Sequence, residues 1–148
     1  MATIILSPDY GFVLAVAVAS SLLVFFFGSK VTSYRKIAQV PLPFLYADAQ
    51  ECKEDHKKLI FNCYQRIHQN TLEGFTMYLV MLLIAGLEYP VASAVLGGVW
   101  CLGRCLYYYG YSSGHPSSRQ LGAFGHIGEF GLLGVVGKMA FDLIVSRS

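Results

Sequence analysis

Charged residues are scarce in this sequence. Lys, Arg, Asp and Glu together make up 14% of the 148 residues, whereas hydrophobic residues make up 55%. This balance argues against an ordinary water-soluble domain. The formal net charge is only +2, and the Lys and Arg residues form no basic stripe interleaved with aromatic residues. Nucleic acid is therefore excluded as a partner.

Cysteines are also few, and their spacing carries no known signature. Cys52, Cys63, Cys101 and Cys105 contain no C-x-x-C pair and have no histidines at the spacing of a zinc site. They are too sparse for the disulfide framework of a small secreted protein. We expect no bound metal, and we interpret Cys101 and Cys105 as small apolar packing residues.

The most informative feature that is present is a long run without charge, Gly11 to Ser29. Its length is close to the roughly 20 residues that cross a bilayer as a helix. A cleavable signal peptide is the alternative, but nothing basic precedes the run and no small-residue cleavage pattern follows it before Lys30. The run therefore predicts a transmembrane helix.

Three further apolar stretches follow, so the sequence predicts an all-α integral membrane protein, a four-helix bundle in one domain spanning residues 1–148. The helices are expected at approximately 9–36, 59–88, 91–112 and 119–146. Pro41 and Pro43 interrupt the polar segment from Lys30 to about Ile60, which predicts a loop outside the membrane.

The distribution of basic residues predicts the orientation. Residues 30–66 contain seven Lys or Arg, whereas the tail before Gly11 and the turn at residues 88–90 contain none. By the positive-inside rule, the large loop faces the cytosol. With four spans, the segment 112–119 lies beside that loop, so Arg119 is also expected at the cytosolic face.

Two groups of polar residues have helical spacing. Arg66, Asn70 and Glu73 lie at i, i+4 and i+7 and therefore share one helix face. They form either a structural Arg66–Glu73 pair or a clamp for a zwitterionic small molecule. Charges at this depth usually face a bundle interior, a partner or a water-filled cavity.

The second group, Arg104, Tyr107 and Tyr111, has a similar spacing and either joins an interfacial aromatic belt or lines a polar cleft.

Arg119 lies just before the last apolar stretch. There it either favours a bound anion, together with a helix N-terminus, or anchors the chain at the lipid headgroups.

The last apolar stretch carries glycines at 122, 125, 128, 131, 134 and 137, which we interpret as a surface for close helix packing. Lys138 and Asp142, at i and i+4, predict a mutual ion pair. For His126 and Glu129, at i and i+3, a structural hydrogen bond is favoured over a proton relay.

Several motifs resemble the family of membrane-associated proteins in eicosanoid and glutathione metabolism (MAPEG). They are DYGFVL near the N-terminus, FNCYQRIHQNTLE in the second predicted helix and GRCLYYYGYSSGHPSSR at the end of the third. The likeness covers nearly the whole chain and is strongest to the type-three microsomal glutathione S-transferase branch. It implies a homotrimer in the endoplasmic reticulum or another intracellular membrane, with glutathione bound between subunits in clefts open to the cytosol.

The resemblance also implies roles for individual residues. Arg66, Asn70, Glu73, Tyr107 and Tyr111 would hold glutathione, with Glu73 suited to its amino group, and Arg35, Lys36 and His68 would complete the site from the adjacent subunit. Arg119 corresponds best to the arginine that activates the thiol. Arg104 is the competing assignment, although its position within a helix better suits a binding or structural role.

A glutathione thiolate held in this way has two reactions open to it. It attacks an electrophilic carbon of a lipophilic substrate, as in leukotriene C4 synthase-like activity, or the O–O bond of a lipid hydroperoxide. The resemblance thus implies a glutathione transferase and peroxidase with glutathione as co-substrate, no metal, and an acceptor that enters from membrane lipid.

One position departs from the family pattern. Gly74 stands where several relatives place a tyrosine that touches glutathione, and Tyr78, one turn later, is expected to compensate in part. A non-catalytic protein that binds or presents lipid is the alternative function. A third, weaker alternative is a small structural membrane protein with incidental charges.

Overall fold

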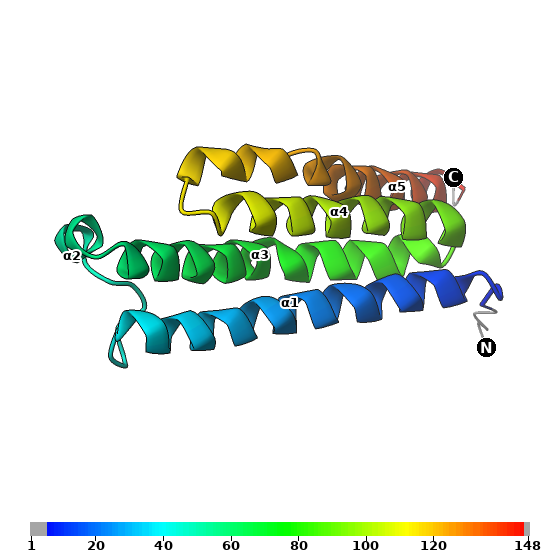
Figure 1. The fold of residues 1–148 in the computed structure, drawn as a ribbon. Helices are drawn as coiled ribbons and strands as arrows, with labels where there is room; N and C mark the ends of the chain where they lie inside the picture. The colour runs from blue at the N-terminus through cyan, green and yellow to red at the C-terminus, as the bar shows by residue number, and fades with distance from the viewer. Residues whose placement is uncertain (1–5, 147–148) are drawn as a thin grey trace.

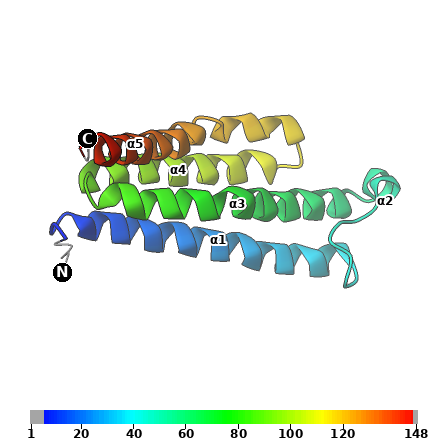
Figure 2. The same cartoon turned by 180° about the vertical axis from the view of Figure 1, so that it is seen from behind.

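The protein is a bundle of four long helices. A computed structural model describes residues 6–146, so the ends of the expected domain, 1–5 and 147–148, lie outside the described residues. The long helices are α1 (Tyr10–Ala38), α3 (His56–Gly86), α4 (Pro90–Tyr111) and α5 (Gly125–Val145), with a short α2 (Ala49–Glu54) and a 3₁₀ helix, η1 (Pro116–Gly122). Figure 1 and Figure 2 show successive long helices running antiparallel, with α2 at the opposite end of the bundle from both chain ends. The predicted all-α four-helix architecture is confirmed.

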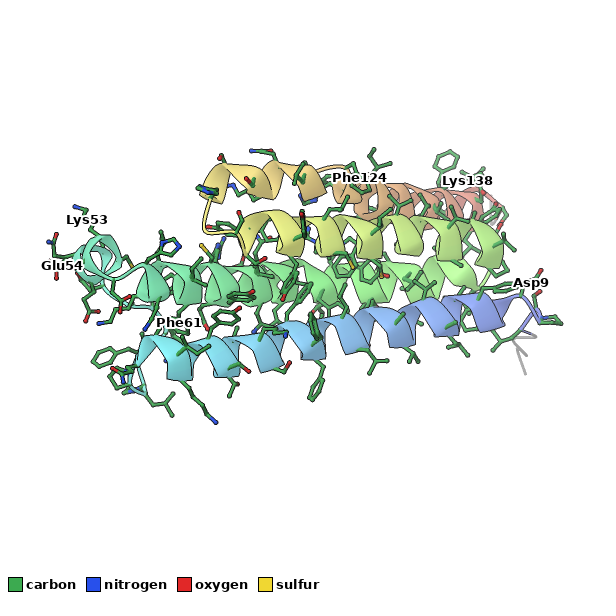
Figure 3. The ribbon with its side chains drawn as sticks, in the orientation of Figure 1. Asp9, Lys53, Glu54, Phe61, Phe124 and Lys138 are labelled. Atoms are coloured by element: carbon green, nitrogen blue, oxygen red, sulfur yellow. The ribbon has the colours of Figure 1, made fainter. Side chains whose placement is uncertain are left out.

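The outer surface of the bundle suits lipid. Helices α1 and α4 are each long and apolar enough to cross a membrane, with mean hydropathies of 2.4 and 1.3. Large apolar side chains point outward along the bundle, such as Phe25, which is 76% exposed. Labelled charged residues lie at the two ends: Lys53 and Glu54 at one, Asp9 and Lys138 at the other (Figure 3). The chain is an integral membrane protein.

Two aromatic clusters fix how the helices pack. Near α2, Phe27 of α1 stacks on Tyr108 of α4 with ring centroids 5.0 Å apart, and Phe61 is buried between α1 and α3 (Figure 3). Near the chain ends, Tyr78 stacks on Trp100 at 3.9 Å, and both are fully buried. Such stacked pairs contribute about 0.5–1.5 kcal/mol beyond the area that they bury.

The segment expected as a loop between residues 30 and 60 contains more helix than predicted. Helix α1 continues to Ala38 and ends where Gln39 adopts a left-handed conformation, φ 54°. Helix α2 follows because Asp48 and Glu51 form a capping box. Lys58 of α3 donates a hydrogen bond to Glu51, and this bond, helped by the lysine charge, holds the pKa of the Glu51 carboxyl below its ordinary value.

The last predicted helix, 119–146, is divided in the structure. Residues 116–122 form η1, and the α-helix starts only at Gly125. Both parts lie along α4 (Figure 1). The contact is close because a Cβ at Gly110 would lie 2.2 Å from the Ser118 carbonyl oxygen, and one at Gly122 would lie 2.6 Å from the Tyr107 Cβ. The division places η1 beside the end of α4.

The glycine series follows the packing interpretation over only part of its length. A Cβ at Gly128 would lie 2.3 Å from the Leu96 carbonyl oxygen, so α5 contacts the α4 backbone there. At Gly134 and Gly137, such a Cβ would meet no described atom within 4 Å apart from the adjacent residues and nearby backbone of α5 itself. The close glycine contacts are therefore confined to the first half of α5.

Candidate functional site

A polar pocket lies where α3, α4, η1 and the start of α5 meet. Its volume is about 200 Å³, and its lining residues are Arg66, Asn70, Arg104, Tyr107, Arg119, Gln120, Gly122, Ala123 and His126. Three guanidinium groups thus surround one cavity at the end of a membrane bundle. This volume is below the roughly 300–1,000 Å³ of small-molecule sites, so the pocket encloses only part of a larger ligand.

The α3 side of the site is a connected group of polar side chains. Arg66 Nη1 lies 3.0 Å from Glu73 Oε1, and Asn70 Nδ2 donates to Glu73 Oε2 at 3.5 Å. The shared face predicted from the spacing is therefore present, and so is the Arg66–Glu73 pair. The side chains of Arg66 and Glu73 are 39% and 49% exposed, so an exposed pair of this kind contributes at most about 1 kcal/mol and leaves both charges accessible to a ligand.

Arg104 occupies the inner wall of the pocket. It is 6% exposed, donates from Nη1 to Asn70 Oδ1 at 3.0 Å, and places its guanidinium 5.4 Å from the Trp100 ring centroid and 5.6 Å from that of Tyr107. Arg104 Nε has no hydrogen-bond partner among the described residues. Its packing suits the binding or structural role that the sequence favoured.

Arg119 differs from Arg104 in its surroundings. It belongs to η1, is exposed, and lines the same pocket from the opposite wall. Its guanidinium is therefore not held by the aromatic packing that surrounds Arg104. The two arginines proposed for thiol activation both reach the pocket, one buried and one exposed.

The tyrosines divide between the pocket and the core. Tyr107 and Tyr111, whose ring centroids are 5.5 Å apart, both pack against the aromatic cluster near α2, but of these two only Tyr107 also lines the pocket. Tyr78 is fully buried, stacks on Trp100, and donates to the Gly97 carbonyl oxygen at 3.3 Å. The expectation that Tyr78 compensates for Gly74 is wrong because its hydroxyl is committed to the core.

Three residues expected at the site lie elsewhere on the same chain. Arg35 Nη1 donates to the Phe44 carbonyl oxygen at 2.6 Å, and Lys36 is exposed in the last turn of α1. His68 faces α1, where a Cβ at Gly28 would lie 3.2 Å from His68 Nε2. A single chain therefore does not bring Arg35, Lys36 and His68 to the pocket that Arg66 and Arg119 line.

The pocket also contains residues that the sequence reasoning did not place there. Gln120 and His126 are part of its wall, and His126 Nδ1 lies 3.0 Å from Glu129 Oε2, which is the predicted hydrogen bond. The sequence does carry a signal for His126: it is an ionisable residue at the start of the apolar stretch that follows Arg119. At the far end of α5, Lys138 and Asp142 form the predicted ion pair at 2.5 Å.

One comparison with known proteins bears on this site. The sequence model of the MAPEG family matches residues 13–137. The matched range includes all four long helices for most of their length, together with η1 and every residue that lines the pocket.

Proposed function

The chain belongs to the MAPEG family, and from this premise we propose that it is a membrane-bound glutathione transferase that also reduces lipid hydroperoxides. The family includes glutathione transferases and peroxidases, and some of its members are not catalytic. The enzyme function therefore rests on the chemistry of this chain's own pocket.

The observation that carries the proposal is the convergence of Arg66, Arg104 and Arg119 with Asn70 and Tyr107 on one cavity. Glutathione has two carboxylates, amide groups and a thiol, so guanidinium, amide and phenol groups are complementary to it. A protein that only presents an apolar lipid gains nothing from placing three cations around a pocket near the membrane.

In the proposed complex, Arg66 and Asn70 bind carboxylate and amide oxygens, and Glu73 binds the amino group. Tyr107 contacts the peptide within the pocket, and Tyr111 supports Tyr107 from one turn away. Arg104 fixes Asn70 through the hydrogen bond between them.

Arg119 is the residue to which we assign thiol activation. The thiolate is the nucleophile, and an ordinary thiol has a pKa of about 8.5. A guanidinium keeps its charge at neutral pH and stabilises the thiolate without losing a proton. Because Arg119 is exposed rather than packed between rings, it is free to follow the sulfur during the reaction.

The remaining parts of the site come from a neighbouring subunit in this proposal. The pocket is too small for the whole tripeptide, and Arg35, Lys36 and His68 lie on another side of the chain. Association into a homotrimer would bring them to the open side of the pocket. The lipophilic electrophile or hydroperoxide then arrives from lipid. The basic segment 30–66 supports a cytosolic orientation of the site, in an intracellular membrane such as the endoplasmic reticulum.

A lipid-presenting function is the second candidate. A shallow apolar hollow of about 650 Å³ lies between α1 and α3, lined by residues such as Leu22, Phe25 and Leu83. An acyl chain fits such a surface. This function requires no glutathione, so binding of glutathione separates the two candidates.

The test is glutathione-dependent turnover by the detergent-purified protein, with a generic electrophile and with a lipid hydroperoxide, for the wild type and Arg119→Ala. We expect Arg119→Ala to bind glutathione within several-fold of the wild type but to lose roughly 10²–10³-fold in kcat, the range seen when one group that stabilises developing charge is removed. Unchanged turnover would transfer thiol activation to Arg104. Absence of glutathione binding by the wild type would favour the lipid-presenting function.

A further inference from the structure

His126 lies in the pocket, but the proposed function assigns it no role. It lies in the first turn of α5 and lines the cavity together with Arg119 and Arg104. Its Nδ1 is 3.0 Å from Glu129 Oε2, and its side chain is 53% exposed. An imidazole is therefore held by one nitrogen at the wall of a cation-lined pocket.

Glu129, the hydrogen-bond partner of His126, is an ionisable residue in a buried position. Its side chain is 8% exposed in the interior of a membrane bundle, where an ionisable group is costly and usually functional. It fits because Gly74 on α3 has no side chain: a Cβ there would lie only 3.3 Å from Glu129 Oε1. The departure from the family pattern at Gly74 thus makes room for the Glu129 carboxylate.

The hydrogen bond to Glu129 determines which nitrogen of His126 faces the ligand. With Glu129 ionised, its carboxylate only accepts hydrogen bonds, so Nδ1 carries the hydrogen and the lone pair of the neutral ring is on Nε2. A carboxylate also stabilises the imidazolium that forms when Nε2 takes a proton. The arrangement is that of a general base held by an acid partner.

From this geometry we propose that His126 accepts the proton of the glutathione thiol and that Glu129 is its positioning residue. The proposal deepens the proposed function and rests on it. Arg119 stabilises the thiolate but cannot take up the proton, because a guanidinium is already fully protonated. His126, as a separate acceptor within the pocket, takes up the proton that Arg119 cannot.

The step balances without an added reagent. The S–H bond breaks, an N–H bond forms at Nε2, and the electron pair stays on sulfur. With an epoxide, the thiolate forms the C–S bond, the C–O bond breaks, and the alkoxide takes the proton back from Nε2. With a hydroperoxide, an S–O bond forms, the O–O bond breaks, and the alkoxide becomes the alcohol; a second glutathione then converts the sulfenic acid to disulfide and water.

Other charged and titratable groups line the same pocket as His126 or lie beside it. They are Arg66 on α3, Arg104 and Tyr107 on α4, Arg119 on η1 and Glu129 on α5, and the carboxylate of Glu73 pairs with Arg66.

The test measures proton release when glutathione binds, by titration calorimetry in buffers of different ionisation enthalpy, together with the ultraviolet absorbance of the bound thiolate. His126→Asn is the informative variant because its amide still donates toward Glu129 while Nε2 is lost; His126→Gln serves as a second variant if it folds poorly. His115→Asn is the matched control, since His115 is exposed and does not line the pocket.

We expect the wild type and His115→Asn to form thiolate while releasing almost no proton near neutral pH. His126→Asn should either form no thiolate until the pH approaches that of free thiol, near 8.5, or release about one proton per thiolate formed. Its kcat should fall by roughly 10²-fold or more, and Glu129→Gln should shift the pH profile in the same direction with a smaller loss.

Two results would overturn the assignment of His126: release of a full proton by the wild type, or a His126→Asn variant with the same thiolate signal and proton count as the wild type. Failure of the wild type to bind glutathione at all is a different result. It would remove the proposed function itself, and the role of His126 with it.

Discussion

At the scale of single residues, a substitution of Glu73 should change glutathione binding much more than the stability of the fold. Its pair with Arg66 is 3.0 Å long but 49% exposed on the glutamate side, so Glu73→Gln should change the free energy of unfolding by no more than about 1 kcal/mol. The same substitution removes the charge proposed to bind the amino group of glutathione. We therefore expect a dissociation constant raised about tenfold or more, with a smaller effect on the chemical step.

Calorimetric titration with glutathione and thermal unfolding of the same variant measure these two quantities. Lys138→Met is a suitable control because it also disrupts an exposed ion pair, with Asp142, at the far end of α5. Should Glu73→Gln lower the unfolding temperature strongly and leave the dissociation constant unchanged, the structural interpretation of the Arg66–Glu73 pair would be correct.

The residue scale also shows what spacing alone could predict. Arg66, Asn70 and Glu73 share a face because a helix repeats every 3.6 residues, and no knowledge of the fold was needed for that prediction. The contact between Arg104 and Asn70 joins α3 to α4, and the burial of Tyr78 against Trp100 depends on how those helices pack. Such contacts follow from the tertiary structure, which the spacing of residues within one helix does not determine.

At the scale of secondary structure, the contacts of the α5 glycines predict a difference in stability between variants that the glycine repeat in the sequence does not predict. The repeat treats Gly128 and Gly137 alike, but only Gly128 meets the α4 backbone, with the Leu96 carbonyl oxygen 2.3 Å from a would-be Cβ. We expect Gly128→Ala to destabilise the protein by about 1–3 kcal/mol through overpacking. The Cβ of Gly137→Ala would meet no described atom within 4 Å apart from the adjacent residues and nearby backbone of α5, so this substitution should be neutral or stabilising by up to about 1 kcal/mol.

Thermal unfolding of the two variants in the same detergent compares them directly. Equal midpoints would show that α5 does not approach α4 as closely as Gly128 indicates.

The division of the last predicted helix into η1 and α5 also depends on close contacts between glycines and α4. Hydropathy shows where an apolar stretch lies, but the turn at residues 122–125 depends on the contact of Gly122 with Tyr107 and of Gly125 with Gly103. The sequence therefore predicted the number of helices better than their ends.

At the scale of the whole molecule, the position of His68 provides a test of shared sites. His68 is two residues from Arg66, which places the two on nearly opposite faces of α3, and its ring lies against Gly28 of α1. The number of basic residues in each segment predicts the orientation in the membrane. A site formed by two chains leaves no periodic pattern in the sequence, so the pairing of His68 with the Arg119 of another subunit could not be predicted from spacing. If His68 contributes to glutathione binding, it does so for a pocket whose Arg119 belongs to a different subunit.

Mixed oligomers test this division. His68→Glu, which would repel the carboxylates of glutathione, and Arg119→Ala should each reduce turnover strongly as uniform oligomers. In the proposed cyclic trimer, an oligomer that contains both variants has one interface that joins an intact Arg119 to an intact His68, so purified mixed oligomers should regain about one third of wild-type turnover. Mixing Arg119→Ala with Glu73→Gln, assayed at glutathione well below the wild-type dissociation constant, is the matched control: both residues come from the same subunit, so no site is intact and turnover should not exceed that of the uniform Glu73→Gln oligomer. Recovery in the control, or none in the first mixture, would contradict a site completed by His68 of a neighbouring subunit.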